Sequence, residues 1–562
     1  MKLKALKPRL HNVIFHTHTV SGIVIGFALF ICFYAGAFAL FLDEMYRWEN
    51  PEARFETVEE VDFDGVLQSL RAHESRLDIN ERFSLLPPSE TNPQVVFYGV
   101  IRTSDSTTER YNAYIHPLTH EITPFTEPKT HMARTIYELH FFYQIPRIGI
   151  YLAGLVGFFF LFAIITGLLI HWKDLASRFY AFTVKGKWKQ IWANGHTVLG
   201  FLTLPFQTIY ALTGALLGIS ILLIAPSAFL LFNGDTNEII KLIRPDFSIV
   251  YEEDAPDLAT PYSLNRIYDR MQTAYPEHEV LVMFTKNYGK EDGTVSVRVD
   301  DHQGLTGDGN FLFKSKTGEL LSAERPYEKT YTTAVYPLLI KLHYATFGGL
   351  SLKIIYFILA MMVCFIISSG VMIWYNARKT SKYTPKQRRF QHRVTKVYLA
   401  LTQGLFPAVA LIFLANKLVP MDLAGRVSYV NGAFFLGWLL LILIGLRWNN
   451  LSRLNRNYLF IGGILGLLIP LANGLVTGDW MWQTFSRGQF YVFSVDLCWL
   501  IAGAVALYLS QKGLKPKDPE IKEPALAEKP DSVKAPVVPT PPPKIREKVK
   551  LLISLIRPKA SH

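Results

Sequence analysis

Eight blocks of about 20 or more mostly apolar residues run along this 562-residue chain. A helix needs about 20 apolar residues to cross a hydrocarbon layer of about 30 Å. We therefore expect eight transmembrane helices, at roughly 15–42, 148–172, 197–226, 352–375, 397–418, 427–446, 457–475 and 488–510. The first block is too long for a signal-peptide core and has no small-residue cleavage site before Asp43, so it should remain as a membrane anchor.

The net charge of +12 follows the membrane pattern and is no sign of nucleic-acid binding. Lys and Arg gather before the first block and in alternate connections after it; eight of them, with no acidic residue, lie at 378–396. The positive-inside rule puts these connections and both termini in the cytoplasm, so 43–133 and 227–335 face outward. We expect a multi-pass protein of a bacterial inner membrane, in contact with lipid.

The three cysteines, Cys32, Cys364 and Cys498, all fall inside apolar blocks. Their positions indicate neither a disulfide framework nor a zinc site. The chain has no C-x-x-C-H motif, which excludes covalently attached c-type haem.

The first four blocks contain an internal repeat. His18 and His196 each begin a His-Thr-Val run and have glycines four and eighteen residues further on. His140 and His343 each follow a leucine, and each precedes a Thr-Gly or Ser-Gly pair whose glycine is 27 residues on. Each unit is thus a helix, an outside domain and a second helix, and the two copies are related by an axis along the membrane normal.

The two outside segments have similar patterns and predict small α+β modules. Helices are expected at 62–72 and 261–274, followed by strands near 82–87, 95–102 and 110–116, and near 279–285, 294–300 and 310–315.

The fold class is therefore a mostly α polytopic membrane protein with duplicated two-helix units and four extra C-terminal helices. The expected parts are the N-terminus and first helix (1–43), a first outside module (44–133), the second and third helices (134–226), a second outside module (227–333), the fourth helix (334–376), a C-terminal membrane region (377–511) and a Pro/Lys-rich cytoplasmic tail (512–562). The tail should be disordered to 543, and 544–559 either lies on the membrane as an amphipathic helix or is solvated.

The four repeat-matched histidines are the leading candidates for chemistry, because histidine in or beside a membrane helix is costly. The repeat pairs His18 with His196 near the inner face and His140 with His343 near the outer face. Such facing imidazoles suit two haem groups, one near each side of the bilayer, and the glycines that follow leave room for a macrocycle. Iron with two histidine ligands has no open position, which favours electron transfer over oxygen activation.

Alternative ligands remain open at the inner face. His16, His171 and His392 also lie on that side, but His171 aligns with Trp374 in the other unit and His16 points away from the face of His18. Zinc or copper fits less well, because the sites lack clustered Cys, Asp or second His residues.

Asp496 is an ionisable residue inside the eighth block. Such residues are functional candidates, here for proton uptake at a quinol site. A packing hydrogen bond near the outer boundary is the other interpretation.

The histidine–glycine spacings and the Leu-His and Thr/Ser-Gly pairs over residues 10–376 resemble the PepSY-associated transmembrane family, iron-regulated membrane proteins of Gram-negative bacteria. The runs HPLTHEI (116–122) and KSKTGEL (314–320) resemble PepSY domains. The resemblance implies a four-helix core with two haem b groups and siderophore-reductase activity in the periplasm, with ferric siderophore as substrate. Its haem iron ligands would be His18, His140, His196 and His343.

The chain departs from this pattern in an extra segment near 287–309 and in the last four helices. Some relatives carry a flavin or nicotinamide reductase domain, but no G-x-G-x-x-G segment occurs here. The electron donor, a quinol or a cytoplasmic reductase, therefore stays open.

Two other function classes compete with this transmembrane oxidoreductase. A PepSY-type sensor or peptidase-modulating protein would use the histidines structurally and would be colourless. A transporter would suit the duplicated bundle, but transport sites use broken helices and buried charge. The first four blocks contain no such charge and no mid-helix proline beyond Pro205.

Overall fold

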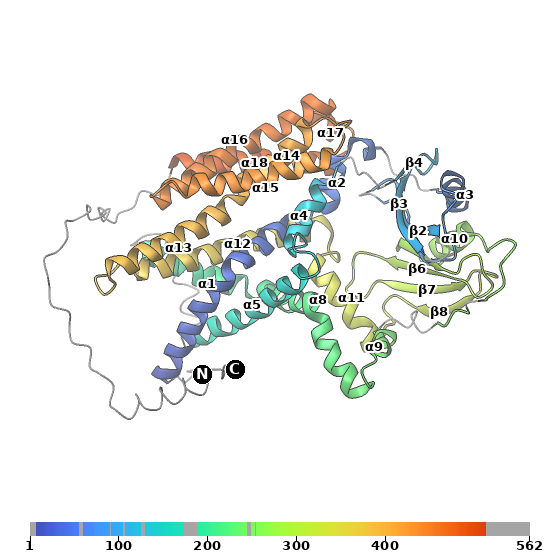
Figure 1. Cartoon of the computed structure of the whole chain (residues 1–562), viewed down its shortest axis with the longest axis horizontal. Helices are drawn as coiled ribbons and strands as arrows, with labels where there is room; N and C mark the ends of the chain where they lie inside the picture. Colours follow the sequence, from blue (N-terminus) through green and yellow to red (C-terminus); the bar gives the residue numbers. More distant parts are fainter. Residues whose placement is uncertain are drawn as a thin grey trace, which may run out of the picture. The chain divides into compact units, whose positions relative to one another are not determined.

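The computed structural model describes residues 7–512, apart from 56–59, 90–91, 105–106, 125–129, 174–187, 244–248 and 253. These residues form a bundle of long helices and one antiparallel sheet (Figure 1). The predicted disordered tail and its amphipathic segment, 544–559, lie outside the described residues.

Seven stretches of the described chain are long and apolar enough to cross a membrane. They are α1 (Pro8–Ala39), α5 (Gly149–His171), α12 (Gly349–Ala377), α13 with α14 (Pro385–Gln403 and Leu405–Leu418), α15 (Arg426–Gly445), α16 (Leu451–Thr477) and α18 (Phe490–Lys512). A bent pair, α7 (Trp188–Leu202) and α8 (Leu204–Leu231), supplies an eighth crossing if it is one span. The chain is therefore a polytopic membrane protein, as predicted.

The third predicted span is not one straight helix, because α7 and the first part of α8 meet at an angle of 71°. Pro205 has no N–H to continue the helical ladder across this point. The Gln207 side chain donates to Gly200 O (3.0 Å) and to Thr203 Oγ1 (2.7 Å), so it satisfies polar groups at the break. The bend is thus a built feature with its own hydrogen bonds.

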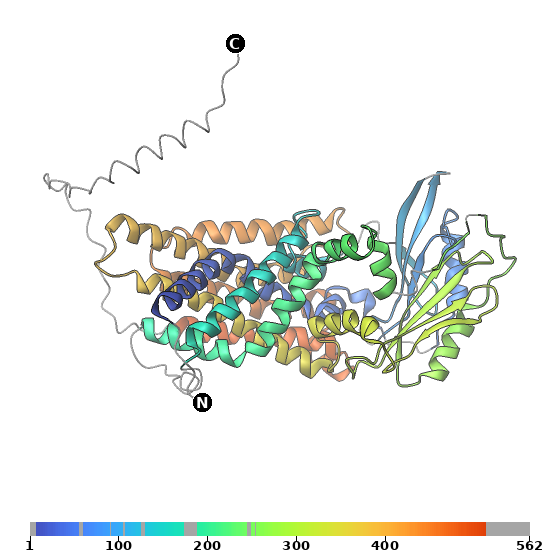
Figure 2. The same ribbon diagram turned by 90° about the horizontal axis from the view of Figure 1, so that it is seen from below.

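Four helical segments from the first 377 residues pack around one core. α1 packs against α5 and α12, α8 packs against α5, and α7 packs against α12. Figure 2 shows these helices side by side along the bundle. The arrangement also brings α1 close to α7, where the rings of His18 and His196 lie 6.3 Å apart.

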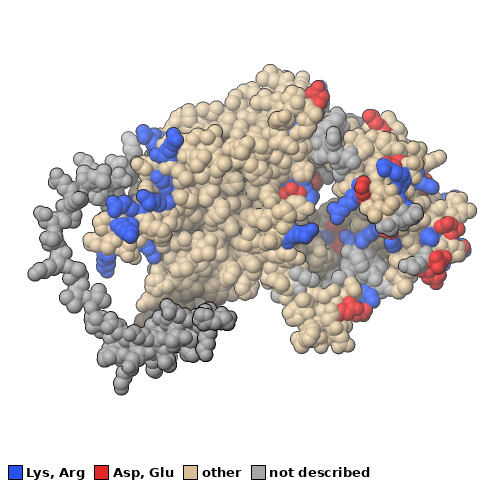
Figure 3. Space-filling model, in the orientation of Figure 1, with Lys and Arg blue, Asp and Glu red and all other residues tan. Residues whose placement is uncertain are grey.

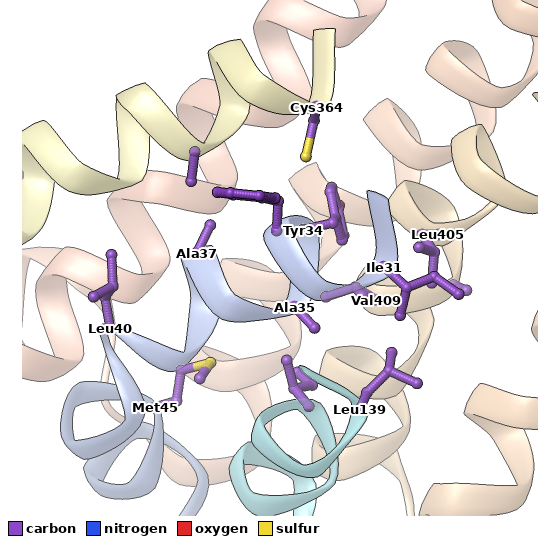
Figure 4. Packing of buried hydrophobic residues seen from close by; sticks show 14 of the residues in the cluster. Ile31, Tyr34, Ala35, Ala37, Leu40, Met45, Leu139, Cys364, Leu405 and Val409 are labelled. Carbon is purple, nitrogen blue, oxygen red and sulfur yellow. The ribbon is translucent and has the colours of Figure 1, made fainter. Parts of the chain in front are cut away.

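The C-terminal half of α1 is enclosed by several helices (Figure 4). Tyr34 lies beside Cys364 of α12, and Leu139 of α4 lies on another side of α1. Leu405 and Val409 of α14 pack against α1 as well. The C-terminal helices are therefore part of the same hydrophobic core as the first four spans.

Short helices at the end of the bundle nearer the sheet link the spans to the sheet. They are α2 (Leu42–Glu49), the 3-10 turn η1 (Pro51–Ala53), α4 (Met132–His140), α9 (Thr236–Ile243), α11 (Tyr331–Tyr344) and α17 (Met481–Ser486). Shortly after α4 and α11 the chain adopts a left-handed conformation, at Phe142 (φ 56°) and Ala345 (φ 54°). Each of these short helices therefore ends before the adjoining span begins.

The two outside modules join into one eight-stranded antiparallel sheet, in the order β4-β3-β2-β1-β5-β6-β7-β8. The strands are β1 (Phe83–Leu86), β2 (Val95–Ser104), β3 (Thr107–Ile115), β4 (Ile122–Pro124), β5 (Glu279–Lys286), β6 (Thr294–Asp300), β7 (Gly309–Lys314) and β8 (Leu320–Glu324). The pairing of β1 with β5, for example Leu85 opposite Met283, joins the two halves. The extra segment 287–309 contributes β6 and the loops on both sides of it.

The helices α3 (Phe63–His73) and α10 (Leu264–Ala274) share one hydrophobic core with the strands of both modules. Their N-termini are capped reciprocally. Asp64 of α3 accepts from Leu264 N (2.8 Å), and Asn265 of α10 accepts from Phe63 N (2.7 Å). These bonds satisfy amides that have no partner within their own helices.

Charge is distributed unevenly over the molecule (Figure 3). Lys and Arg gather at the end of the bundle near the connection of α12 and α13, while both signs of charge occur over the sheet. An end rich in basic residues is typical of the cytoplasmic side of an inner-membrane protein.

Candidate functional site: two histidine pairs

His18 of α1 and His196 of α7 lie opposite each other in the bundle. Their ring centroids are 6.3 Å apart and the rings are nearly perpendicular, at 78°. Both side chains are half-buried. The structure therefore brings together the inner pair that the repeat predicted.

The two inner rings are oriented by matching groups on the neighbouring spans. His18 Nδ1 lies 3.0 Å from Ala163 O and 3.2 Å from Thr166 Oγ1 of α5. His196 Nδ1 lies 2.9 Å from Ile366 O and 3.2 Å from the hydroxyl of the next Ser-Gly pair, on α12. Because a carbonyl only accepts, each Nδ1 carries the hydrogen and each Nε2 presents its lone pair.

His140 at the end of α4 and His343 in α11 form the outer pair, with ring centroids 5.8 Å apart. His140 Nδ1 donates to Cys32 O of α1 at 2.7 Å. His343 Nδ1 lies 2.9 Å from Thr213 Oγ1, whose own hydrogen is donated to Ile209 O. The threonine oxygen therefore accepts from Nδ1, and both outer rings present Nε2 as a lone pair.

Burial keeps the outer rings neutral. It lowers the pKa of His140, against a smaller opposing effect of the hydrogen bond to Cys32. It lowers the pKa of His343 to about 3, and the neighbouring His140 ring adds to this. Neutral imidazole is the form that binds a metal ion.

The spacing of each pair fits one iron between two imidazoles. With metal–nitrogen bonds of about 2 Å and about 1 Å from nitrogen to ring centre, two such rings have centroids about 6 Å apart. The observed separations are 6.3 and 5.8 Å. A metal-binding histidine commonly donates its other ring N–H to a carbonyl or hydroxyl, as all four do here.

Glycines surround both pairs. A Cβ on Gly22 or on Gly200, four residues after each inner histidine, would meet no atom within 4 Å, so space is open at both positions. By contrast, a Cβ on Gly167 would lie 3.2 Å from Cε1 of His18, and one on Gly36 would lie 2.7 Å from Nδ1 of His140. The first two glycines leave room that a flat cofactor would use, and the other two allow close approach to the rings.

The other candidate histidines have different surroundings. His171 lies against Phe201, with ring centroids 6.3 Å apart, and His16 is exposed beside Phe15. His392 Nδ1 lies 2.9 Å from the Tyr375 hydroxyl.

The donor set also bears on zinc and copper. Across the described ranges, no three His, Cys, Asp or Glu side chains gather around one point. Structural zinc takes four protein ligands and catalytic zinc takes three. Each histidine pair supplies only two, which suits a cofactor that brings its own ring of four nitrogens.

Three hydroxyl residues orient the histidines although no role was predicted for them: Thr166, Ser369 and Thr213. The signal for the first two was present, since they are the hydroxyl residues of the Thr-Gly and Ser-Gly pairs. Thr213 had no such signal, because its repeat counterpart is Ala35.

Aromatic side chains fill the core between the pairs. Phe33, Phe206, Tyr210 and Tyr356 are in mutual contact, with neighbouring ring centroids 4.5–6.3 Å apart. Tyr210 also donates its hydroxyl to His343 O (2.8 Å) and touches that ring. The cluster therefore begins at the His140–His343 pair, and from His18 to Cys32 the rise of α1 is about 21 Å.

Asp496 is fully buried in α18 and accepts two hydrogen bonds, from Trp48 Nε1 (2.7 Å) and Asn473 Nδ2 (2.9 Å). Both carboxylate oxygens are therefore satisfied by α2 and α16. The geometry favours the packing interpretation of this residue over proton uptake.

Comparison with known proteins gives a family assignment. A search of curated proteins finds no match. The model of the PepSY-associated TM region family matches residues 15–377, which is more than half of the chain and includes all four paired histidines. The chain therefore belongs to the PepSY-associated TM region family.

Proposed function

We propose that the chain is an inner-membrane di-haem protein that passes electrons across the bilayer and reduces ferric siderophore iron in the periplasm. One observation carries the proposal. Four imidazoles form two pairs, with ring centroids 6.3 and 5.8 Å apart, and each donates its Nδ1 hydrogen to the protein, which leaves the Nε2 lone pair free for a metal.

The inner haem b would be held by His18 and His196, and the outer one by His140 and His343. When bound, haem would supply one-electron redox chemistry, and the two imidazoles of each pair would hold its iron. The protein's part is to fix ring orientation through the Nδ1 hydrogen bonds. It also keeps the sites dry, since the aromatic cluster between the pairs is largely buried.

We further propose that the core arose as a duplicated two-helix unit. The contact of His18 with Thr166 is repeated by His196 with Ser369. The two histidines are 178 residues apart in sequence, and the two hydroxyl residues are 203 apart. In this interpretation each half of the joined sheet is one PepSY-like module, and both copies run the same way through the membrane.

The orientation follows from charge. The basic end of the bundle would face the cytoplasm together with both termini, so the outer pair and the sheet would face the periplasm (Figure 3). Electrons would enter near His18 from a quinol or a cytoplasmic reductase. They would leave near His343, where Tyr344 touches the ring and is partly exposed.

A ferric siderophore suits this reaction because its hard oxygen ligands bind ferric iron far more strongly than ferrous iron. Reduction by one electron therefore releases the metal and leaves the chelator intact. The test is to reduce the purified protein with dithionite, remove the excess, and add ferric hydroxamate or ferric catecholate chelates in a stopped-flow spectrometer. Reoxidation with ferrous release supports the proposal, and a reduced protein that stays reduced with every chelate rejects this substrate class.

A transport function keeps one supporting feature, the 71° bend between α7 and α8. Broken helices form binding sites in many transporters. Here the polar groups at the break, Thr203 and Gln207, bond to each other and to the backbone. Proteoliposomes with an internal reductant and external ⁵⁵Fe chelate separate the two activities, since a transporter accumulates the label inside and a reductase releases ferrous iron outside.

A PepSY-type sensor or peptidase-modulating role is the non-enzymatic alternative. It predicts a protein without haem, in which His18 and His140 only stabilise the bundle. Replacing either by alanine would then change stability and leave the absorption spectrum as featureless as before.

A further inference from the structure

The C-terminal membrane region, 385–512, lies beyond the family match, yet two of its helices hold the helix that carries His140. Asn416 of α14 donates Nδ2 to Thr130 Oγ1 at 2.8 Å. Asn431 of α15 accepts from Thr135 Oγ1, also at 2.8 Å. These contacts lie just before α4 and within its first turn.

Glu49 at the end of α2 anchors the same helix. Its Oε2 accepts from Met132 N (2.8 Å), Ala133 N (3.2 Å) and Thr130 Oγ1 (2.8 Å). The residue before the helix makes no side-chain cap of its own. Glu49 therefore satisfies free amides at this N-terminus, which have no partner within the helix.

The C-terminal region in turn holds α2. Trp48, which is fully buried, donates its indole N–H to Asp496. Lys417 of α14 donates to Trp48 O at 2.6 Å, and its ammonium lies 4.0 Å from the centre of the indole ring. Glu49 is thus fixed from the C-terminal side through the residue next to it.

A buried ion pair also joins the α2 segment to the C-terminal region. Arg54, just after η1, bonds Asp479 at 2.6 Å and also donates to Trp48 O and Asn473 Oδ1. Asp479 follows α16, so the link again runs from the α2 segment to the C-terminal region. Breaking such a pair on one side leaves an uncompensated buried charge, so the segment has little freedom to move.

We infer that the C-terminal region 385–512 is a clamp that positions His140, with Glu49, Asn416 and Asn431 as positioning residues. The inference rests on the proposed function in so far as His140 is taken as an outer haem ligand. α4 has only nine residues, too few to be stable by itself, so its external contacts set where the His140 ring lies.

The clamp acts on one ligand of the outer pair only. α11, which carries His343, packs against α8 and α9 and bonds the sheet through Lys341 and Asp300. In the described structure no hydrogen bond joins α11 to the C-terminal region. α11 meets α4 through a hydrogen bond between the Tyr344 and Tyr137 hydroxyls (3.0 Å). Loosening the clamp should therefore disturb α4 much more than α11.

The first test measures hydrogen exchange of the full-length chain by mass spectrometry and needs no cofactor. The double variant Asn416→Leu, Asn431→Leu removes both bonds to α4 while keeping side-chain volume. We expect peptides over 130–141 to exchange about tenfold faster, since each lost bond contributes modestly to holding the helix. Peptides over 331–344 should change far less, because α11 keeps its contacts with α8, α9 and the sheet. Asn455→Leu, at an exposed position of α16, is the matched control and should change neither.

The second test follows the outer haem in the same variants by electron paramagnetic resonance, with His140→Ala and His18→Ala to assign the two signals. In the double variant the outer signal should be shifted and the inner signal unchanged. In the single variant Asn431→Asp, which keeps the acceptor for Thr135 Oγ1, the outer signal should lie where it does in the unmodified protein.

Unchanged exchange over 130–141 in the double variant would overturn the clamp. Faster exchange with an unshifted outer signal would overturn its positioning role. If the unmodified protein holds no haem, the proposed function fails, and the exchange experiment still decides whether the region holds α4.

Discussion

The ion pair between Lys341 and Asp300 offers a quantitative test of how the sheet is joined to the bundle. Lys341 Nζ lies 2.6 Å from Asp300 Oδ1 and donates to Gly304 O at 2.8 Å. Both charged side chains are 5% exposed. Lys341 is two residues before His343, and Asp300 ends β6, so the pair connects the sheet to the helix of the outer pair.

Asp300→Asn leaves the ammonium buried without its nearest counter-charge. Breaking a buried pair on one side typically costs about 3–5 kcal/mol. We take about 3 kcal/mol, because Asp308 lies 3.9 Å from the ammonium and compensates part of the loss. Since 1.4 kcal/mol is a factor of ten, local opening should become about a hundredfold more frequent.

Hydrogen exchange over β6 and α11 reads this opening directly, at residues 294–300 and 331–344. The control is Glu291→Gln, which breaks the exposed pair with Lys316 and should have almost no effect. Adding Lys341→Met to Asp300→Asn removes both charges and should restore most of the protection. An effect of Asp300→Asn as small as that of Glu291→Gln would refute the reasoning.

Three further outcomes are expected. Gly22→Leu enters open space, so the variant should fold with stability within about 1 kcal/mol of the unmodified protein, yet lose one haem equivalent by haemochrome assay. The hydrogen bond to Glu279 raises the pKa of His302. The stabilisation of the sheet by this bond is therefore complete below about pH 6.5 and is lost as pH rises through the raised pKa. Thermal unfolding should show a higher stability at pH 6 than at pH 8, and His302→Gln should abolish the difference. Trp48→Phe removes a donor to a buried carboxylate and should cost roughly 1–3 kcal/mol in chemical denaturation, whereas the exposed Trp482→Phe should cost almost nothing.

The membrane helices were the most predictable part of the fold. The block 427–446 became α15 (Arg426–Gly445), and 352–375 became α12 (Gly349–Ala377), because apolar length alone decides whether a helix crosses a bilayer. The bend after Leu202 was harder to predict from the sequence. Pro205 signalled it, but a proline only permits a bend, and the hydrogen bonds of Gln207 belong to the folded chain.

The sheet was predicted strand by strand but not as a whole. Alternating residues marked β1 and β5, yet nothing local in a strand tells which distant strand it pairs with. The pairing of Leu85 with Met283 depends on both modules packing α3 and α10 over one core. The sequence pattern therefore predicts two modules, where the structure has one sheet.

The histidine pairs were predictable because the repeat relates residues that are far apart in sequence. His18 and His196 met as expected, and so did His140 and His343. The groups that orient the histidine rings were harder to predict from the sequence. Cys32 contributes only its backbone carbonyl, which no residue pattern encodes, and the role of Thr166 required knowing which ring it faces.

The central claim is that each histidine pair holds one haem b. The most direct measurement is the dithionite-reduced minus oxidised spectrum of the detergent-purified protein, with a pyridine haemochrome assay for stoichiometry. The account predicts two low-spin b haems per chain, one of which is lost in each of His18→Ala, His196→Ala, His140→Ala and His343→Ala. A protein without haem after expression with haem supplied, or one whose haem content is unaffected by all four changes, would contradict it.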